Sequence, residues 1–197
     1  KSKKIRLLSD FAYSGNGPSY NDYIDDEEKS INYINIIYVC WLIVTFSLQF
    51  IWNIDAKDGF YRVPLQNIFV PLSGVKLCGL IFFFVCLVMG MASACNLYGE
   101  FADIICWIIV SNNRELFELP PIPDDAYPNP QPNVFDESTP LWRRELAQQT
   151  FLYHYCDDFG GGATTYALAQ AQFNVVILWW NLLGVPTNIR KLNPPAR

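Results

Sequence analysis

Three long stretches of the chain are apolar and carry almost no charge, and they set the first expectations about its fold. They run from Ile34 to Ile54, from Leu77 to Cys95 and from Tyr166 to Val185. Because an α-helix rises about 1.5 Å per residue, roughly 20 such residues cross a hydrocarbon core of about 30 Å. The pattern therefore predicts an all-α, polytopic integral membrane protein with three transmembrane helices.

A fourth apolar stretch has the periodicity of a helix with one apolar face. Apolar residues recur at the i, i+3, i+4, i+7, i+8 spacing, at Phe101, Ile104, Ile105, Ile108 and Ile109. Glu100 and Asp103 make another complete span less favourable, so we expect an amphipathic helix over residues 99–119. The alternative is a fourth span within residues 97–113.

The stretches between these helices divide the chain into four expected segments. Residues 1–33 form an extramembrane arm, and residues 34–119 form a transmembrane hairpin (34–54 and 75–97) extended by the amphipathic helix. Residues 120–164 are an extended linker, because seven prolines between 120 and 140 exclude continuous helix, followed by a short soluble helix from Leu141 to Tyr155. The third transmembrane helix and a basic tail occupy residues 165–197.

Each predicted membrane helix carries a stripe of small or amide side chains on one face. Small residues let helix backbones approach closely, and amides form hydrogen bonds between helices in lipid. These stripes are therefore predicted helix–helix interfaces. Their members are Asn35, Thr45 and Gln49 in the first helix, Gly79, Gly90 and Ser93 in the second, and Ala163, Ala167, Gln170, Asn174 and Asn181 in the third.

Composition agrees with a membrane location and argues against a nucleic-acid partner. Of 197 residues, 51% are apolar and only 17% are charged, whereas soluble domains carry about 25% charged residues. The formal net charge is −5, and nucleic-acid-binding proteins usually present a basic face. Most of the six cysteines lie in apolar runs, where thiols behave as small hydrophobic groups, so no disulfide framework is expected.

Few residues carry candidate chemistry. Lys76 is the one charge touching the three apolar runs, and it either acts within the membrane or extends its ammonium to the interface. His154, Cys156, Asp157 and Asp158 resemble metal ligands, but a zinc site needs a second ligand pair that the chain lacks. The glycines at 160–162 are not followed by the lysine of a phosphate loop. We therefore expect no catalytic residue, no metal and no cofactor, although a bound phospholipid is compatible with the pattern.

These observations favour a non-catalytic, accessory subunit of a large membrane complex. Its partners would be other subunits and the lipid bilayer, with no nucleic acid and no small-molecule substrate. A first residue that is not methionine suits a removed targeting segment, so the best-fitting setting is a respiratory-chain or ATP synthase assembly of the mitochondrial inner membrane. The alternatives are a small transporter or channel protomer that uses Lys76, and a four-span scaffold or adhesion protein.

Overall fold

The computed structural model describes residues 11–12, 17–29, 34–126, 128 and 141–197. The chain divides into two compact units, each built from two separate stretches of sequence. Unit 1 comprises the described residues of Lys1–Ile31 and Asp58–Tyr98. Unit 2 comprises those of Asn32–Lys57 and Gly99–Arg197. Each unit is described below by itself.

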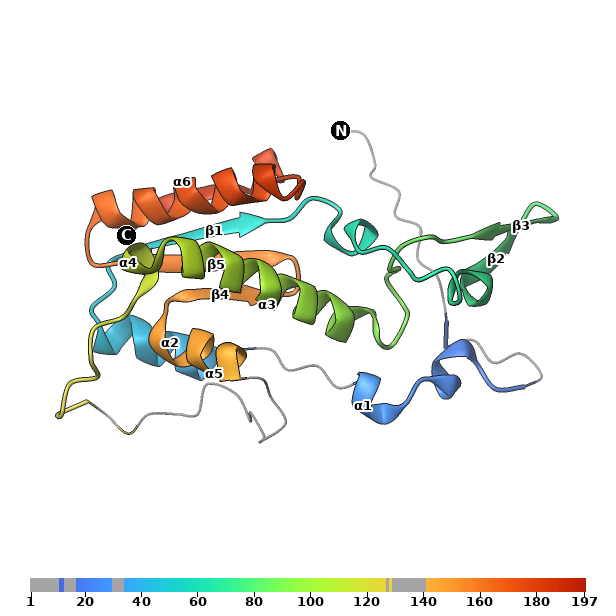
Figure 1. The fold of residues 1–197 in the computed structure, drawn as a ribbon, viewed down its shortest axis with the longest axis horizontal. Coiled ribbons are helices and arrows are strands. Elements are labelled where there is room, and N and C mark those ends of the chain that lie inside the picture. Colours follow the sequence, from blue (N-terminus) through green and yellow to red (C-terminus); the bar gives the residue numbers. More distant parts are fainter. Residues whose placement is uncertain (1–10, 13–16, 30–33, 127, 129–140) are drawn as a thin grey trace. The chain divides into compact units, whose positions relative to one another are not determined.

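A four-stranded sheet forms the centre of unit 2, and its order is β4-β5-β1-β6. Every pair of neighbouring strands is antiparallel. Strand β1 is an inner strand because it pairs with β5 on one side and with β6 on the other, which places two segments from after residue 157 beside it (Figure 1). The strands are β1 (Phe50–Asp55), β4 (Leu152–Tyr155), β5 (Asp158–Ala163) and β6 (Asn193–Ala196).

Helix α6 (Tyr166–Leu182) covers one face of this sheet (Figure 1). The Oγ1 atom of Thr165 caps its start by accepting a hydrogen bond from the backbone N–H of Leu168. The buried side of the helix contains Ala169, Gln172, Phe173, Val176 and Trp180. The Trp180 ring meets that of Phe159 in β5 at 4.9 Å between centroids. One side of the helix is therefore part of the core of unit 2.

The opposite face of the sheet packs against helix α2 (Ile36–Thr45). Successive residues of a strand point to opposite faces, so Ile51 faces away from α6 when Trp52 faces toward it. Trp52 donates a hydrogen bond to Gln172 of α6, whereas Ile51 packs against the core cluster around α2. That cluster consists of Tyr38, Val39, Leu42, Phe46, Leu48 and Phe151.

The described part of unit 2 also contains three further α-helices: the portion of α3 (Ala94–Asn112) from residue 99 onward, α4 (Arg114–Phe117) and α5 (Leu141–Gln149). Asp103 of α3 links the other elements, because its carboxylate forms an ion pair with Arg143 of α5 and lies 2.8 Å from Nε2 of His154 in β4. The rings of Trp107 and Trp142 add an edge contact between α3 and α5.

Unit 1 contains a two-stranded hairpin of β2 (Gly74–Leu77) and β3 (Leu80–Phe83). Its two-residue turn, Cys78 and Gly79, has positive φ at both positions (51° and 81°), which suits the right-handed twist of the strands. The other described elements are the 3-10 helices η1 (Tyr20–Tyr23), η2 (Gly59–Arg62) and η3 (Val70–Ser73) and the short helix α1 (Asp26–Lys29).

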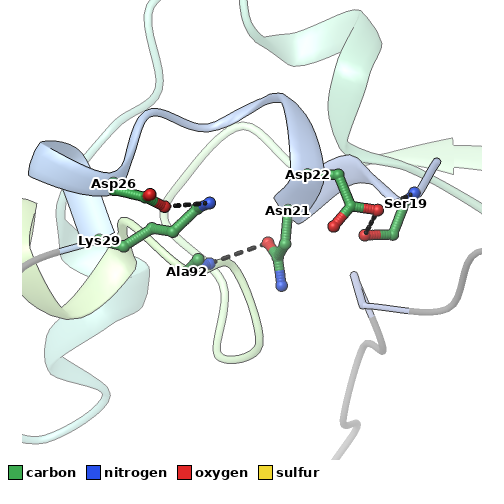
Figure 2. Close-up of polar contacts among 6 residues, drawn as sticks. All are labelled: Ser19, Asn21, Asp22, Asp26, Lys29 and Ala92. Atoms are coloured by element: carbon green, nitrogen blue, oxygen red, sulfur yellow. Dashed lines mark hydrogen bonds and ion pairs between the residues drawn. The ribbon is translucent and has the colours of Figure 1, made fainter.

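Side-chain hydrogen bonds hold the η1 segment of unit 1 in place (Figure 2). The Asn21 side chain accepts from the backbone N–H of Ala92 at 2.9 Å and donates to the Gly90 carbonyl at 3.1 Å. Asp22 accepts from both the N–H and the hydroxyl of Ser19, and these bonds hold the pKa of its carboxyl below the usual range. The side chains of Asn21 and Asp22 thus hold η1 in place, although this segment is not part of a sheet.

The prediction of an all-α, polytopic membrane protein is wrong, because the described residues form a mixed α/β structure with six strands in two antiparallel sheets. The first apolar run contains α2 and then β1, the second contains β3 and the start of α3, and the third is α6. Among the described helices only α3 has the length and apolar character of a membrane span, and a buried core helix has the same two properties. Most of the proline-rich segment lies outside the described residues.

The physical reason for this difference is that a long apolar run does not specify one helix. A buried strand is as apolar as a membrane helix over five or six residues, and only the length of the element separates them. Here Ser47, at φ 50°, breaks the first run between helix and strand without a glycine or proline to mark the turn. The apolar side of α6, which would suit lipid, packs against the sheet instead.

Candidate metal centre

Three aspartates meet at one end of the sheet of unit 2. Asp55 is the last residue of β1 and Asp158 is the first residue of β5, and the antiparallel register places them directly opposite each other. Asp157 precedes Asp158 in the turn between β4 and β5. One carboxylate oxygen from each residue lies within 4.8 Å of the others. We call these three residues the aspartate cluster.

A tight turn places two of the three carboxylates. Tyr155 pairs with Asp158, so Cys156 and Asp157 alone connect β4 to β5. Cys156 has a φ of 51°, a left-handed conformation that is uncommon for residues other than glycine. The backbone N–H of Ala56 donates to the Asp157 carbonyl at 2.7 Å, which fastens the turn to the end of β1. The cluster therefore stands on strand ends and a short turn rather than on a long loop.

The segment after α6 fixes the third carboxylate. Nδ2 of Asn188 donates to Oδ1 of Asp55 at 2.7 Å, and the Asn188 backbone N–H donates to the Asp55 carbonyl at 3.0 Å. Nζ of Lys191, at the end of the 3-10 helix η4 (Ile189–Lys191), donates to Oδ2 of Asp55 at 2.5 Å. The Asp55 side chain is only 4% exposed. Its position is thus set by β1 and by residues more than 130 positions later in the chain.

The electrostatics of the cluster favour a bound cation. Burial, followed by the charges of Asp157 and Asp55, raises the pKa of the Asp158 carboxyl, while Lys191 acts in the opposite direction. The hydrogen bond to Asp55 raises the pKa of Lys191. Like charges directly opposite each other on neighbouring strands are destabilising. An arrangement that opposes Asp55 to Asp158 therefore gains from a positive charge between them.

The donor set matches a hard divalent cation. Carboxylate oxygens are the preferred ligands of Mg²⁺, Mn²⁺ and Ca²⁺, whereas zinc prefers sulfur and nitrogen. In octahedral Mg²⁺ coordination, opposite ligand oxygens lie about 4.2 Å apart and neighbouring ones about 3 Å apart, so the three oxygens, which lie within 4.8 Å of one another, move closer together when they share one ion. They also suit two ions about 3.5–4 Å apart, the spacing of two-metal catalytic sites.

Among the residues that the structure describes, no histidine or cysteine joins the cluster. The sequence grouped His154 with Asp157 and Asp158, but the His154 ring pairs with Asp103 and lies beside Phe159. The apolar pattern did not reveal Asp55, because the first predicted membrane helix ends at residue 54. A strand ending in aspartate, followed much later by an Asp-Asp pair in a tight turn, is the signal that would have revealed it.

The structure distributes the predicted interface residues of the third apolar run over two environments. Ala163 is buried as the last residue of β5. Ala167, Asn174 and Asn181 are exposed on α6, where Asn174 accepts a hydrogen bond from the half-buried Gln170 at 2.9 Å. Whether this outer side of α6 contacts another helix stays a prediction.

The remaining predicted positions lie in both units. In unit 2, Asn35 caps α2, Thr45 lies near its end, and the Gln49 backbone N–H donates to the Ala163 carbonyl. The positions in unit 1 are Lys76, which is exposed in β2, Gly79 in the hairpin turn, Gly90 beside Asn21, and the buried Ser93.

Comparisons with known proteins give no further assignment. No protein-family model matches the chain, and a search of curated proteins finds no significant match. The geometry of the aspartate cluster is therefore the main clue to function.

Proposed function

We propose that unit 2 is the catalytic core of a divalent-cation-dependent phosphoryl-transfer enzyme, and that its reaction is nucleotidyl transfer of the kind polymerases perform. The observation that carries the proposal is the convergence of Asp55 with Asp157 and Asp158 at one end of the sheet. Mg²⁺ sites built from one or two carboxylates and completed by substrate phosphates are typical of polymerases and other nucleotide-dependent enzymes.

The number of protein ligands supports a catalytic rather than a structural site. A structural Ca²⁺ site takes six to eight oxygens, mostly from the protein. Here three side-chain carboxylates converge among the described residues, fewer than the number of protein oxygens that such a structural site uses. Most coordination positions of a bound ion would then remain for water and substrate oxygens.

The residues around the cluster favour a reaction in which the substrate supplies its own nucleophile. Hydrolysis commonly uses a histidine or another side chain to activate water. The chain has one histidine, and that residue pairs with Asp103. In nucleotidyl transfer the attacking hydroxyl and the leaving phosphate both belong to the substrates, and bound divalent ions supply the charge that stabilises both oxygens. The three aspartates need only hold and orient those ions.

This proposal departs from the expectations based on apolar runs and charge. The expectation of an accessory membrane subunit stays a prediction, but the all-α fold that supported it is wrong. The net charge of −5 predicted no nucleic-acid partner, and that also stays a prediction. A centre of this kind contacts phosphate through divalent ions, so it requires no basic surface at the point of chemistry.

The first test is Mn²⁺ binding to the 197-residue chain, measured by titration calorimetry and by the paramagnetic resonance signal of free Mn²⁺. We expect binding by the wild type and losses of at least about tenfold in Asp55→Asn, Asp157→Asn and Asp158→Asn. Asp124→Asn is the matched control because Asp124 is an exposed carboxylate outside the cluster. Equal binding by all four variants would refute a metal centre at these residues.

The second test supplies a primed nucleic-acid template and the four nucleoside triphosphates with Mg²⁺ or Mn²⁺. Nucleotidyl transfer predicts extension of the primer by the wild type and none by Asp158→Asn. Shortening of the primer instead would assign the centre to phosphodiester hydrolysis. Metal binding with neither extension nor shortening would overturn the assignment to phosphodiester chemistry.

A further inference from the structure

The Lys191 ammonium occupies the cation-binding edge of Asp55. Both carboxylate oxygens of Asp55 already have a donor from the same short segment, with Asn188 on Oδ1 and Lys191 on Oδ2. The Asp55 side chain is 4% exposed, but the Lys191 side chain is 57% exposed. The carboxylate is therefore held by the sheet, whereas the lysine reaches it from the surface.

A lysine ammonium and a divalent ion compete for such an oxygen. Both are cations, and they repel each other at the separation that shared coordination of one oxygen would impose. Asp55 has little freedom to move because its backbone carbonyl is bonded to the Asn188 N–H and its strand pairs on both sides. The lysine has a long flexible stem that already faces solvent, so it is the group that yields.

We propose that Lys191 is an intramolecular counter-cation that occupies the Asp55 edge of the aspartate cluster until a divalent ion displaces it. This inference rests on the proposed metal centre and goes beyond it, because it assigns a competing group and a movement to metal binding. Lys191 lowers the repulsion among the three aspartates when no ion is bound. Metal binding releases its ammonium and frees η4 from one of its two side-chain links to Asp55.

The residues on either side of Lys191 keep the sheet in place when a metal ion displaces the lysine. Lys191 lies two residues before β6, and Asn193 of β6 pairs with Asn53 of β1. Asn188 keeps its own bonds to Asp55 at the other end of η4. The movement is therefore confined to the Lys191 side chain and the short turn that carries it, and β1 stays in register.

Mn²⁺ affinity tests the competition. Lys191→Met removes the ammonium and keeps a stem of similar length, so we expect Mn²⁺ to bind about two- to fivefold more tightly, the factor that a partly exposed ion pair contributes. Arg190→Met removes the same charge from the adjacent exposed residue, for which the structure shows no contact with Asp55, and should change the affinity less. Lys191→Arg keeps a cation and should stay close to the wild type.

A second measurement uses the wild-type chain and does not depend on how a variant folds. Acetylation of lysines by a water-soluble succinimidyl ester, quantified by peptide mass spectrometry, should modify Lys191 several-fold faster when Mn²⁺ saturates the protein. Lys76, exposed in the hairpin of unit 1, serves as the internal reference whose rate should not change.

The outcomes separate this inference from the proposed function. Tighter Mn²⁺ binding by Lys191→Met than by Arg190→Met, together with faster acetylation of Lys191, supports displacement. Mn²⁺ binding that is equal in these two variants, or a Lys191 acetylation rate unaffected by Mn²⁺, overturns the displacement and leaves the metal centre intact. Absence of Mn²⁺ binding in the wild type and in every variant overturns the metal centre itself.

Discussion

Replacing Gly161 by alanine tests the packing that supports the candidate metal centre. A Cβ atom at this position of β5 would overlap Cζ2 of Trp52, lie 2.7 Å from its Cε2 and lie 3.1 Å from the Phe151 carbonyl oxygen. The Trp52 ring is 1% exposed, and its Nε1 donates to Gln172 at 3.0 Å. The ring has no free direction to move without breaking that bond or displacing α6.

The loss of stability expected for Gly161→Ala has two causes. Forcing an additional methyl group into a packed core costs about 1–3 kcal/mol. Weakening a buried hydrogen bond, here that of Trp52 to Gln172, adds about 1 kcal/mol. We therefore expect Gly161→Ala to lower the free energy of unfolding of unit 2 by about 2–4 kcal/mol, a large part of the roughly 5–15 kcal/mol that stabilises a typical domain.

The matched control is Gly99→Ala. Gly99 lies within α3, and a Cβ there would meet no atom within 4 Å. Because glycine lowers helix stability relative to alanine, this variant should gain about 0.5–1 kcal/mol. Replacing glycine by alanine is thus expected to lower the free energy of unfolding at position 161 and to raise it at position 99.

Urea denaturation followed by tryptophan fluorescence measures both variants. All six tryptophans belong to unit 2, so the signal reports on that unit. They are Trp41, Trp52, Trp107, Trp142, Trp179 and Trp180. A Gly161→Ala protein as stable as the wild type would show that β5 does not pack against Trp52 as described.

Two further predictions concern titratable groups of unit 2. The raised pKa of Asp158 means that the metal-free folded protein binds this proton more readily than the unfolded chain, so the Asp158 contribution to stability is lost as pH rises through that pKa. In EDTA at neutral pH, Asp158→Asn should therefore unfold at a higher urea concentration than the wild type. This difference in urea concentration should shrink as pH falls. A variant that is less stable than the wild type at neutral pH would contradict the prediction. Burial, and then the charge of Asp103, raise the pKa of Cys106 well above 9.0, so at pH 8 iodoacetamide should label the exposed Cys78 and leave Cys106 unlabelled until urea is added. Labelling of both thiols at similar rates in the folded protein would show that Cys106 is not buried.

Parts of the secondary structure follow from local patterns in the sequence. The apolar spacing between Phe101 and Ile109 predicts a helix, and α3 covers that stretch. The strands of the central sheet do not follow in the same way, because residues 50–55 continue an apolar run that a helix begins. Pairing with β5 and β6, residues far away in the sequence, selects the strand conformation there.

The glycines of β5 illustrate a second limit of local reasoning. Three consecutive glycines usually interrupt regular structure, yet residues 160–162 lie within β5. In the sheet, aromatic rings of Tyr153, Trp52 and Phe151 fill the space beside them that side chains would otherwise occupy. The residues that favour a strand here are therefore the aromatic residues that pack against β5, and not the glycines of β5 itself.

The same limit applies to the aspartate cluster. Asp157 and Asp158 attracted notice as adjacent acids near a histidine and a cysteine. Asp55 could not be joined to them without the register of β1 against β5. The expectation of no metal considered only ligands that lie close together in the sequence. The carboxylates of Asp55, Asp157 and Asp158 come together because β1 and β5 pair in the sheet.

The contacts of Asp55 also set the order in which the chain can fold during synthesis. Its hydrogen-bond partners lie 133 and 136 residues further along, at Asn188 and Lys191. A ribosome has to produce the chain beyond Lys191 before both contacts form, and such long-range pairing is slow. Before residue 158 is made, the end of β1 has neither β5 nor β6 beside it, and its apolar edge is open to association with other chains. Nascent chains stalled before residue 158 are therefore expected to bind chaperones at β1, and release of full-length chains should end that binding.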